Sequence, residues 1–234
     1  MTNPEAGEAA VIVGATGGIG AALADAVEGW GRFAVVHRLS RSSSPAIDLE
    51  NEASIAEAAA RIGRGPAPTL ILVATGVLHH GQEPERSYRA LTAEHMLRDY
   101  RINTVGPALI AKHLLPLLPR DRRAVFAALS ARVGSISDNR LGGWHSYRAS
   151  KAALNMVLRN LAIEVGRSHL QAVVAGLHPG TVETALSAPF QKGVPVGKLF
   201  SAAHSAERLL AVLDGLSPAD SGGVFAWDGA RIPE

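Results

Sequence analysis

The sequence predicts an α/β fold in which a doubly wound parallel sheet of about seven strands forms the middle of three layers, with helices on both faces. Three observations support this prediction. Short runs of apolar and β-branched residues alternate with longer segments of helical period. A glycine-rich turn follows the first of these runs. The 234 residues include 47% hydrophobic residues and 24 glycines, enough for a sizeable core with many tight turns.

The order of the elements follows from this alternation. Buried strands are predicted at residues 9–13, 33–37, 69–74, 124–129 and 170–177, with a weaker one near 223–227. Helices are predicted at 18–29, 51–62, 91–118, 146–166 and 204–214. We expect a single domain over 1–234, with a flexible N-terminus at 1–8 and a long mobile loop at 185–203.

Composition excludes several classes of function. The formal net charge is +2 and the basic residues are scattered, so we expect neither a nucleic-acid nor a membrane partner. The chain has no cysteine, which excludes disulfides, thiolate catalysis and cysteine-bound zinc. No signal peptide and no apolar run near 18 residues is evident, so a soluble cytoplasmic protein is expected.

The turn after the first strand predicts a nucleotide site. It reads GATGGIG, and the residues assigned to cofactor binding in it are Gly14, Thr16, Gly18, Ile19 and Gly20. Where side chains are missing, backbone amides can approach a pyrophosphate, and the start of a helix favours negative charge. A glycine-rich turn alone is weak evidence, but its place between a strand and a helix strengthens it.

The residues after the second strand distinguish NADP from NAD. NAD-binding proteins usually carry an acid there for the ribose 2′-hydroxyl, whereas an arginine accommodates a 2′-phosphate. This chain has no acid between Gly29 and Ile47, and it offers Arg38 and Arg41. We therefore expect NADP(H) as the cofactor, with Arg41 as the first choice of phosphate ligand and Arg38 as the second. The alternative is that both are solvated surface arginines.

The segment YRASKAALN places Tyr147 four residues before Lys151, on one face of a predicted helix. Together with the glycine turn, this pair resembles the short-chain dehydrogenase/reductase family, with a Rossmann-type fold. The closest likeness is to its C-factor and sniffer-like carbonyl reductase branch. Further matches extend over nearly the whole chain: Asn103 in RINTVG, Asp48 and Leu49 in IDL, Ala74 and Gly76 in VATG, and Pro179, Gly180, Val182 and Thr184 in HPGTVET.

The resemblance implies hydride transfer between NADP(H) and a carbonyl or secondary alcohol. In that reaction Tyr147 is the general acid/base. A nearby ammonium favours the phenolate, so Lys151 is expected to lower the tyrosine's pKa and to hold the nicotinamide ribose. Asn103 is expected to support a water that relays protons to Lys151. The alternative function is a nucleotide-binding signalling or regulatory protein on the same fold, with little turnover.

Two departures from the family pattern matter. The family carries a serine at the end of the fifth strand, but Gly134 or Ala131 stands there, depending on the alignment. Ser135 or Ser130 is the candidate substitute, with a slight preference for Ser135, and either is equally well explained as a turn residue. The second departure is Ala74, which replaces an asparagine beside the adenine. Thr75 compensates for it in part at most.

The remaining candidates concern the substrate pocket and partners. The pocket is expected to include Ser135, Trp144, Tyr147, His178 and the loop 185–203, which we take as the substrate loop. His79 and His80 are interpreted as loop histidines, and no metal is expected. By resemblance, the predicted helices 91–118 and 146–166 form the interface of a homodimer or homotetramer. The physiological substrate, reaction direction and stereochemistry do not follow from the sequence.

Overall fold

The computed structural model describes residues 7–79, 83–193, 195 and 197–234, so most of the N-terminus predicted to be flexible lies outside the described residues. The strands are β1 (Ala9–Val13), β2 (Val35–Leu39), β3 (Pro68–Val73), β4 (Ala124–Leu129), β5 (Ala172–His178), β6 (Thr181–Val182), β7 (Leu199–Phe200), β8 (Val224–Ala226) and β9 (Arg231–Ile232). The helices are α1 (Gly18–Gly29), α2 (Glu52–Ile62), α3 (Ala93–Tyr100), α4 (Gly106–Leu114), α5 (His145–Gly166) and α6 (Ala202–Gly215).

The main sheet has seven strands in the order β2-β1-β3-β4-β5-β8-β9. All neighbouring pairs are parallel except β8 and β9. The chain first builds outward from β1 to β2 and then continues with β3 on the other side of β1. The direction of winding therefore reverses between β1 and β3, and a crevice is expected outside the carboxyl ends of these strands.

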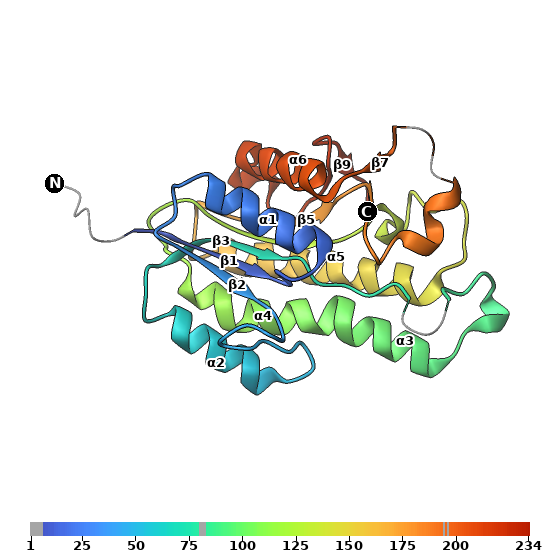
Figure 1. The fold of residues 1–234 in the computed structure, drawn as a ribbon, viewed down its shortest axis with the longest axis horizontal. Helices are drawn as coiled ribbons and strands as arrows, with labels where there is room; N and C mark the ends of the chain where they lie inside the picture. The colour runs from blue at the N-terminus through green and yellow to red at the C-terminus, as the bar shows by residue number, and fades with distance from the viewer. Residues whose placement is uncertain (1–6, 80–82, 194, 196) are drawn as a thin grey trace.

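Helices cover both faces of the sheet, as Figure 1 shows, with α1 and α6 on one face and α2, α4 and α5 on the other. The central strands are buried on both faces, which explains why they read as continuous apolar runs instead of alternating ones. Phe126 of β4, which is fully buried, belongs to the core beneath α2, α4 and α5. The predicted α/β class with about seven strands is confirmed.

The segment predicted as one helix over 91–118 is interrupted. After α3, residues Arg101–Val105 form a π-helical turn before α4 begins, and Leu115–Leu117 form a 3-10 turn. Thr92 caps the start of α3 by accepting a hydrogen bond from the His95 amide, 3.2 Å away. Single π turns inside α-helices are frequent at functional sites, and this one contains Asn103.

The loop 185–203 is not featureless. It contains a 3-10 helix at Ala188–Gly193, and β7 near its end pairs with β6. These short elements and β9 were not predicted, because two-residue strands leave no periodic signal. Among the described residues, none of the helices is both long and apolar enough to cross a bilayer.

Candidate active site

A cleft opens at the carboxyl ends of β1 and β3, where the winding of the sheet reverses. Its empty space, including open solvent, is about 1130 Å³. Predicted cofactor residues that line it are Gly14, Thr16, Arg41, Asp48, Leu49, Ala74 and Gly76. Residues from three separate predicted motifs thus meet in one crevice, which is the position expected for a dinucleotide.

The glycine turn is shaped by close backbone approaches. Gly14 has a φ of +88°, and a Cβ there would lie 3.0 Å from the carbonyl oxygen of Ala74. A Cβ at Gly20 would lie 2.1 Å from the carbonyl oxygen of Gly14, so both positions require glycine. Helix α1 begins at Gly18 with Gly17 as its cap, and no side chain caps its first amides. These amides suit a phosphate group.

The segment after β5 reaches the same turn. The Cγ2 atom of Thr184 lies 2.8 Å from where a Cβ of Gly18 would be. Gly180 has a φ of +78°, and a side chain there would meet Phe200 and Trp227. Val182 of β6 is buried and pairs with Phe200, so this pairing fixes the path of the motif that also contains Pro179. Ile19, in the first turn of α1, packs partly buried against the core.

The two candidate arginines differ in position. Arg41 lines the cleft next to Ser40 and Asp48. The guanidinium of Arg38 instead forms ion pairs with Asp25 and Glu28 of α1. Arg41 is therefore placed where a bound dinucleotide could reach it, whereas the Arg38 guanidinium is engaged with α1, and the choice between them as phosphate ligand stays a prediction.

The two residues that follow β3 are Ala74 and Thr75, and Thr75 carries a polar side chain. Ala74 donates its amide to the Val13 carbonyl, 2.8 Å away, which ties β1 to β3 without the asparagine. Thr75 lines the cleft, and its buried hydroxyl has no hydrogen-bond partner among the described residues. A bound dinucleotide fits this cleft, because it would supply a partner to that hydroxyl and a phosphate to the open amides of α1.

Tyr147 and Lys151 lie in the first two turns of α5, and both side chains are buried at 8% and 2% exposure. The Lys151 Nζ atom is 5.8 Å from the centre of the Tyr147 ring and donates to the Leu129 carbonyl, 2.8 Å away. Burial lowers the pKa of Lys151 to about 8. Burial, with a smaller contribution from Asp99, raises the pKa of Tyr147 above its ordinary value.

The pKa of Tyr147 was expected to be lowered by Lys151, and in this structure it is raised instead, because burial of the phenol is the main influence and Asp99 adds to it. The phenol is protonated at neutral pH. A protonated phenol is the form that can donate a proton to an alkoxide.

Asn103 joins three parts of the site. Its side chain accepts a hydrogen bond from the Val77 amide at 2.8 Å and donates to the Val77 carbonyl at 2.9 Å and to the Ser150 hydroxyl at 3.1 Å. Asn103 is fully buried. It links the π turn, the segment after β3 and helix α5, and it lies beside Gly76, where a Cβ would be 3.3 Å from its side-chain oxygen.

The hydroxyls of the two candidate serines are engaged elsewhere. Ser130 donates to the side-chain oxygen of Asn155 at 2.6 Å, and Ser135 accepts from the Asp138 amide at 3.1 Å. Ala131 of this segment belongs to the same apolar cluster as Tyr147, and the partly buried Val133 packs against that cluster. A substrate-holding role for Ser135 or Ser130 stays a prediction, and it requires either side chain to leave its present partner.

An aromatic wall borders Tyr147. The Trp144 ring is 6.3 Å from the Tyr147 ring and 5.0 Å from the ring of Phe190, which lies in the 3-10 helix of loop 185–203. Leu78 and Leu186 also belong to the apolar cluster around Tyr147. This cluster contains Trp144 and part of the loop, two of the predicted pocket elements.

The candidate histidines that the structure describes, His79 and His178, lie in different surroundings. Burial lowers the pKa of His178 to about 4, so its ring is neutral. His79 contacts the Ala185 carbonyl at 3.2 Å, whereas His80 lies outside the described residues. In the part of the chain that the structure describes, no group of three or more His, Asp or Glu residues is arranged to hold a metal ion.

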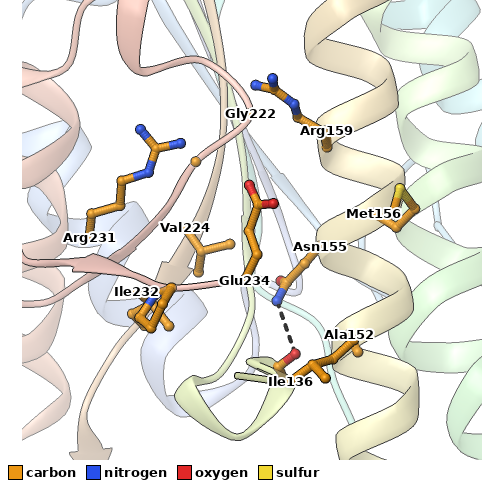
Figure 2. A pocket seen from close by; sticks show the side chains of 13 residues that line it. Ile136, Ala152, Asn155, Met156, Arg159, Gly222, Val224, Arg231, Ile232 and Glu234 are labelled. Atoms are coloured by element: carbon orange, nitrogen blue, oxygen red, sulfur yellow. Dashed lines mark hydrogen bonds between the residues drawn. The ribbon is translucent and has the colours of Figure 1, made fainter. Parts of the chain in front are cut away.

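A second cavity lies between α5 and the C-terminal strands, as Figure 2 shows, with about 580 Å³ of empty space including open solvent. Asn155, Met156 and Arg159 of α5 face Val224 and Ile232 across it. None of the predicted catalytic or cofactor residues lines this cavity. Its connection to the site is Asn155, which accepts the hydrogen bond from Ser130 and approaches the Gly134 carbonyl at 3.5 Å.

Three buried ionisable residues near Tyr147 were not predicted: Glu85, His95 and Asp99. His95 and Asp99 precede Asn103 by eight and four residues, so the spacing that places them on its side of the helix was visible in the sequence. Their burial was not visible, because charged residues in a helix are usually solvated.

Comparisons with known proteins find oxidoreductases among the relatives of this chain. A family model described as "Enoyl-(Acyl carrier protein) reductase" matches residues 14–214. The C-signal protein of Myxococcus xanthus is 34% identical over 138 residues, which are 59% of this chain and 78% of that protein. The 1-hydroxy-2-glutathionyl-2-methyl-3-butene dehydrogenase of Rhodococcus sp. strain AD45 is 30% identical over 189 residues, 80% of this chain and 78% of that protein.

Solved structures share the fold. The NADPH-bound carbonyl reductase from chicken fatty liver superimposes with a TM-score of 0.79 at 24% identity, covering 97% of this chain and 99% of that one. The carbonyl reductase Sniffer of D. melanogaster gives a TM-score of 0.81 at 21% identity, covering 97% and 100%. At these identities the likeness establishes the architecture.

Proposed function

Because the chain belongs to the short-chain dehydrogenase/reductase family of oxidoreductases, we propose that it is an NADP(H)-dependent carbonyl reductase. It would transfer a hydride between the nicotinamide and a carbonyl or secondary alcohol. The observation that carries the proposal is the buried Tyr147–Lys151 pair next to the dinucleotide cleft, with Asn103 joining the two.

Each residue has a defined part in this reaction. The nicotinamide, when bound, supplies the hydride. Tyr147 donates its phenolic proton to the carbonyl oxygen, which would otherwise become a high-energy alkoxide. Lys151, whose pKa is about 8, is charged in most molecules at neutral pH and stabilises the phenolate that remains. Asn103 holds the segment after β3 against α5 and thereby keeps the dinucleotide cleft next to the proton donor Tyr147.

The choice of NADP(H) over NAD(H) rests on Arg41 and on the missing acid after β2. Arg41 lines the cleft and can form a charge-assisted bond with a 2′-phosphate. Two solved proteins of the same fold are described as bound to NADPH and to NADP, namely the chicken carbonyl reductase and a short-chain dehydrogenase/reductase from Burkholderia multivorans.

Replacing the proton donor tests the proposal. Tyr147→Phe should lower turnover of aldehydes, ketones and quinones by about 100-fold or more, since general acid catalysis contributes at least that factor. NADPH affinity should be nearly unchanged. The assay follows loss of NADPH absorbance, and binding is measured by fluorescence titration.

Tyr88→Phe is the matched control, because it removes the same hydroxyl from an exposed side chain. It should leave both the turnover and the NADPH affinity unchanged. Full activity in the Tyr147 variant would rule out the assigned reaction.

A signalling or regulatory protein is the second candidate. It is favoured by Ala131, which leaves Tyr147 without a neighbouring hydroxyl on that side, and by the similarity to the C-signal protein. Such a protein would bind NADPH and reduce none of the carbonyls in the panel. The same assay on the unaltered protein distinguishes the two functions.

A further inference from the structure

Behind the Tyr147–Lys151 pair lies a buried cluster of three ionisable side chains, which we call the Glu85–His95–Asp99 cluster. Their exposed fractions are 3%, 5% and 1%. The ring of His95 stands between the two carboxyl groups, with Nδ1 3.5 Å from Oε1 of Glu85 and Nε2 3.8 Å from Oδ1 of Asp99. Ionisable groups are rarely buried without a purpose, because their desolvation is costly.

The Glu85 end of the cluster caps the helix that carries the catalytic pair. Its carboxylate accepts hydrogen bonds from the amide of Ser146, at 3.2 Å, and from the Ser146 hydroxyl. Burial alone would raise the pKa of Glu85, but these hydrogen bonds outweigh it and hold the pKa below its usual value. The ionised carboxylate of Glu85 therefore lies at the N-terminus of α5, where it binds Ser146, the residue before Tyr147.

The Asp99 end is close enough to the catalytic pair to act on it electrostatically. Neither of its carboxylate oxygens has a hydrogen-bond partner among the described residues. Burial raises the pKa of Asp99 to about 6, and the groups that act on it are His95, Glu85 and Arg98 together with Lys151 of α5. Asp99 acts in turn on both Tyr147 and Lys151.

Lys151 depends on this carboxylate. Its ammonium is buried, and desolvation favours loss of its proton. Of the described acidic residues, Asp99 is the one whose charge opposes that loss. The same negative charge opposes ionisation of the Tyr147 phenol. Ionised Asp99 therefore keeps protons on both groups, which is the state needed to reduce a carbonyl.

We infer that Asp99 is a positioning residue of the active site, which supplies a buried negative charge that keeps Lys151 and Tyr147 protonated and which lies beside His95, whose ring stands between Asp99 and Glu85. The catalytic part of this inference rests on the proposed reductase function. The electrostatic part does not, and it can be measured without substrate or cofactor.

The lysine content of the chain makes that measurement direct. There are four lysines, Lys112, Lys151, Lys192 and Lys198, of which Lys151 is the buried one. Nuclear magnetic resonance of protein labelled in the lysine side chains gives four titration curves, and Lys151→Met assigns the curve of interest. In Asp99→Asn the midpoint of Lys151 should fall by about one pH unit, as expected for loss of a nearby opposite charge.

Glu94→Gln is the matched control. It converts a carboxylate to an amide on the same helix, but at an exposed position, and should leave the Lys151 curve unchanged. An unchanged or raised Lys151 midpoint in Asp99→Asn overturns the inference.

A second measurement covers the case in which Asp99→Asn does not fold. In the unaltered protein labelled in the aspartate carboxyl groups, one carboxyl should titrate near pH 6, with a step in the Lys151 signal at the same pH. If every aspartate titrates near its ordinary value and Lys151 shows no step, the inference fails.

Rate measurements then test the catalytic role. The rate of carbonyl reduction should decline with rising pH as the Tyr147–Lys151 pair loses a proton. In Asp99→Asn this decline should begin about one pH unit lower, together with the titration of Lys151. If the titration midpoint of Lys151 shifts in Asp99→Asn but the pH dependence of the reduction rate does not, Asp99 does not act on the reaction. Absence of carbonyl reduction in the unaltered protein would refute the proposed function instead, while the lysine titration still decides the role of the cluster.

Discussion

Ala131 presents a methyl group to the apolar cluster of Tyr147, just after the strand that gives Lys151 its carbonyl partner. A hydroxyl at this position would donate a hydrogen bond to a developing oxyanion. We therefore expect Ala131→Ser to raise kcat for carbonyl reduction by about 10-fold, measured with the ketone that the unaltered protein reduces best.

Ser135→Ala is the companion variant. If the Ser135 hydroxyl stays with the Asp138 amide, kcat is unaffected and only some stability is lost. A large loss of kcat in Ser135→Ala, with no gain in Ala131→Ser, would identify Ser135 as the substrate-holding residue.

The two arginines after β2 give a second test at the residue scale. Arg41→Ala should weaken NADPH binding about 10-fold or more and leave NADH binding nearly unchanged, because only NADPH carries the 2′-phosphate. Arg38→Ala removes an equal charge that is paired with Asp25 and Glu28, so it should change neither affinity appreciably. Equal weakening of NADPH and NADH by Arg41→Ala would contradict the assignment.

At this scale the sequence predicted the residues whose spacing carries information. Tyr147 and Lys151 are four apart on a helix, and both are found together and buried. Arg38 and Arg41 were not separable by sequence, because the ion pairs of Arg38 depend on how α1 packs beside β2. The raised pKa of Tyr147 could not be predicted from the sequence either, since desolvation depends on the complete fold.

At the scale of elements, helix α5 is fixed at its start by a distant residue. Trp144, the residue before the helix, has a φ of +49°, a left-handed conformation that is unfavourable for a side chain of this size. Its amide donates to the Glu85 carbonyl at 2.5 Å, while the Glu85 carboxylate binds Ser146. The segment around Glu85 thus holds α5 in the position that places Tyr147.

Ser146→Ala tests this attachment. Loss of a buried hydrogen bond to a charged acceptor should lower the free energy of unfolding by about 2 kcal/mol and reduce kcat through displacement of Tyr147. Ser205→Ala is the control, because it removes a buried hydroxyl that bonds to the neutral Pro179 carbonyl at 2.9 Å. The control should cost about 1 kcal/mol. Urea unfolding measures both, and equal costs would show that the charge of Glu85 contributes nothing.

The boundaries of two helices were predictable because helical periodicity is a local property of the sequence. The predicted helix 18–29 coincides with α1, and 146–166 differs from α5 by one residue. The π turn at Arg101–Val105 was missed, since its sequence continues the helical period on both sides. The strand predicted at 33–37 is shifted to β2 (Val35–Leu39), because the register is set by pairing with β1.

For the whole molecule, Asp99 predicts an unusual pH dependence of stability. Its pKa in the folded protein is about 6, above its ordinary value of 3.8, so the folded state binds the proton more tightly than the unfolded state does. The contribution of this group is therefore fully present below pH 3.8 and is lost as the pH rises towards 6. Above that pH the ionised carboxylate costs up to about 3 kcal/mol.

Asp99→Asn removes this cost. The free energy of unfolding of the variant, minus that of the unaltered protein, should therefore increase between pH 4 and pH 7 and level off above it. Urea denaturation at several pH values gives the difference directly, and a difference independent of pH would contradict the assigned ionisation.

The sheet order also explains why the predicted cofactor motifs meet in one cleft. In a doubly wound sheet, ligands bind at the carboxyl ends of the strands where the winding reverses, and the predicted cofactor motifs follow strands. The homodimer or homotetramer stays a prediction. Leu97 and Met156, both exposed on α3 and α5, are where contacts with another copy are expected.

The parallel arrangement has a practical consequence at the opposite rim of the sheet. The connections 30–34, 63–67, 118–123 and 167–171 enter the strands at their amino ends, and none contains a residue assigned to chemistry or cofactor. Since the chain has no cysteine, Arg64→Cys would introduce a unique thiol at an exposed position there. A fluorophore or spin label attached to it would report on tumbling and self-association while the reacting groups remain untouched.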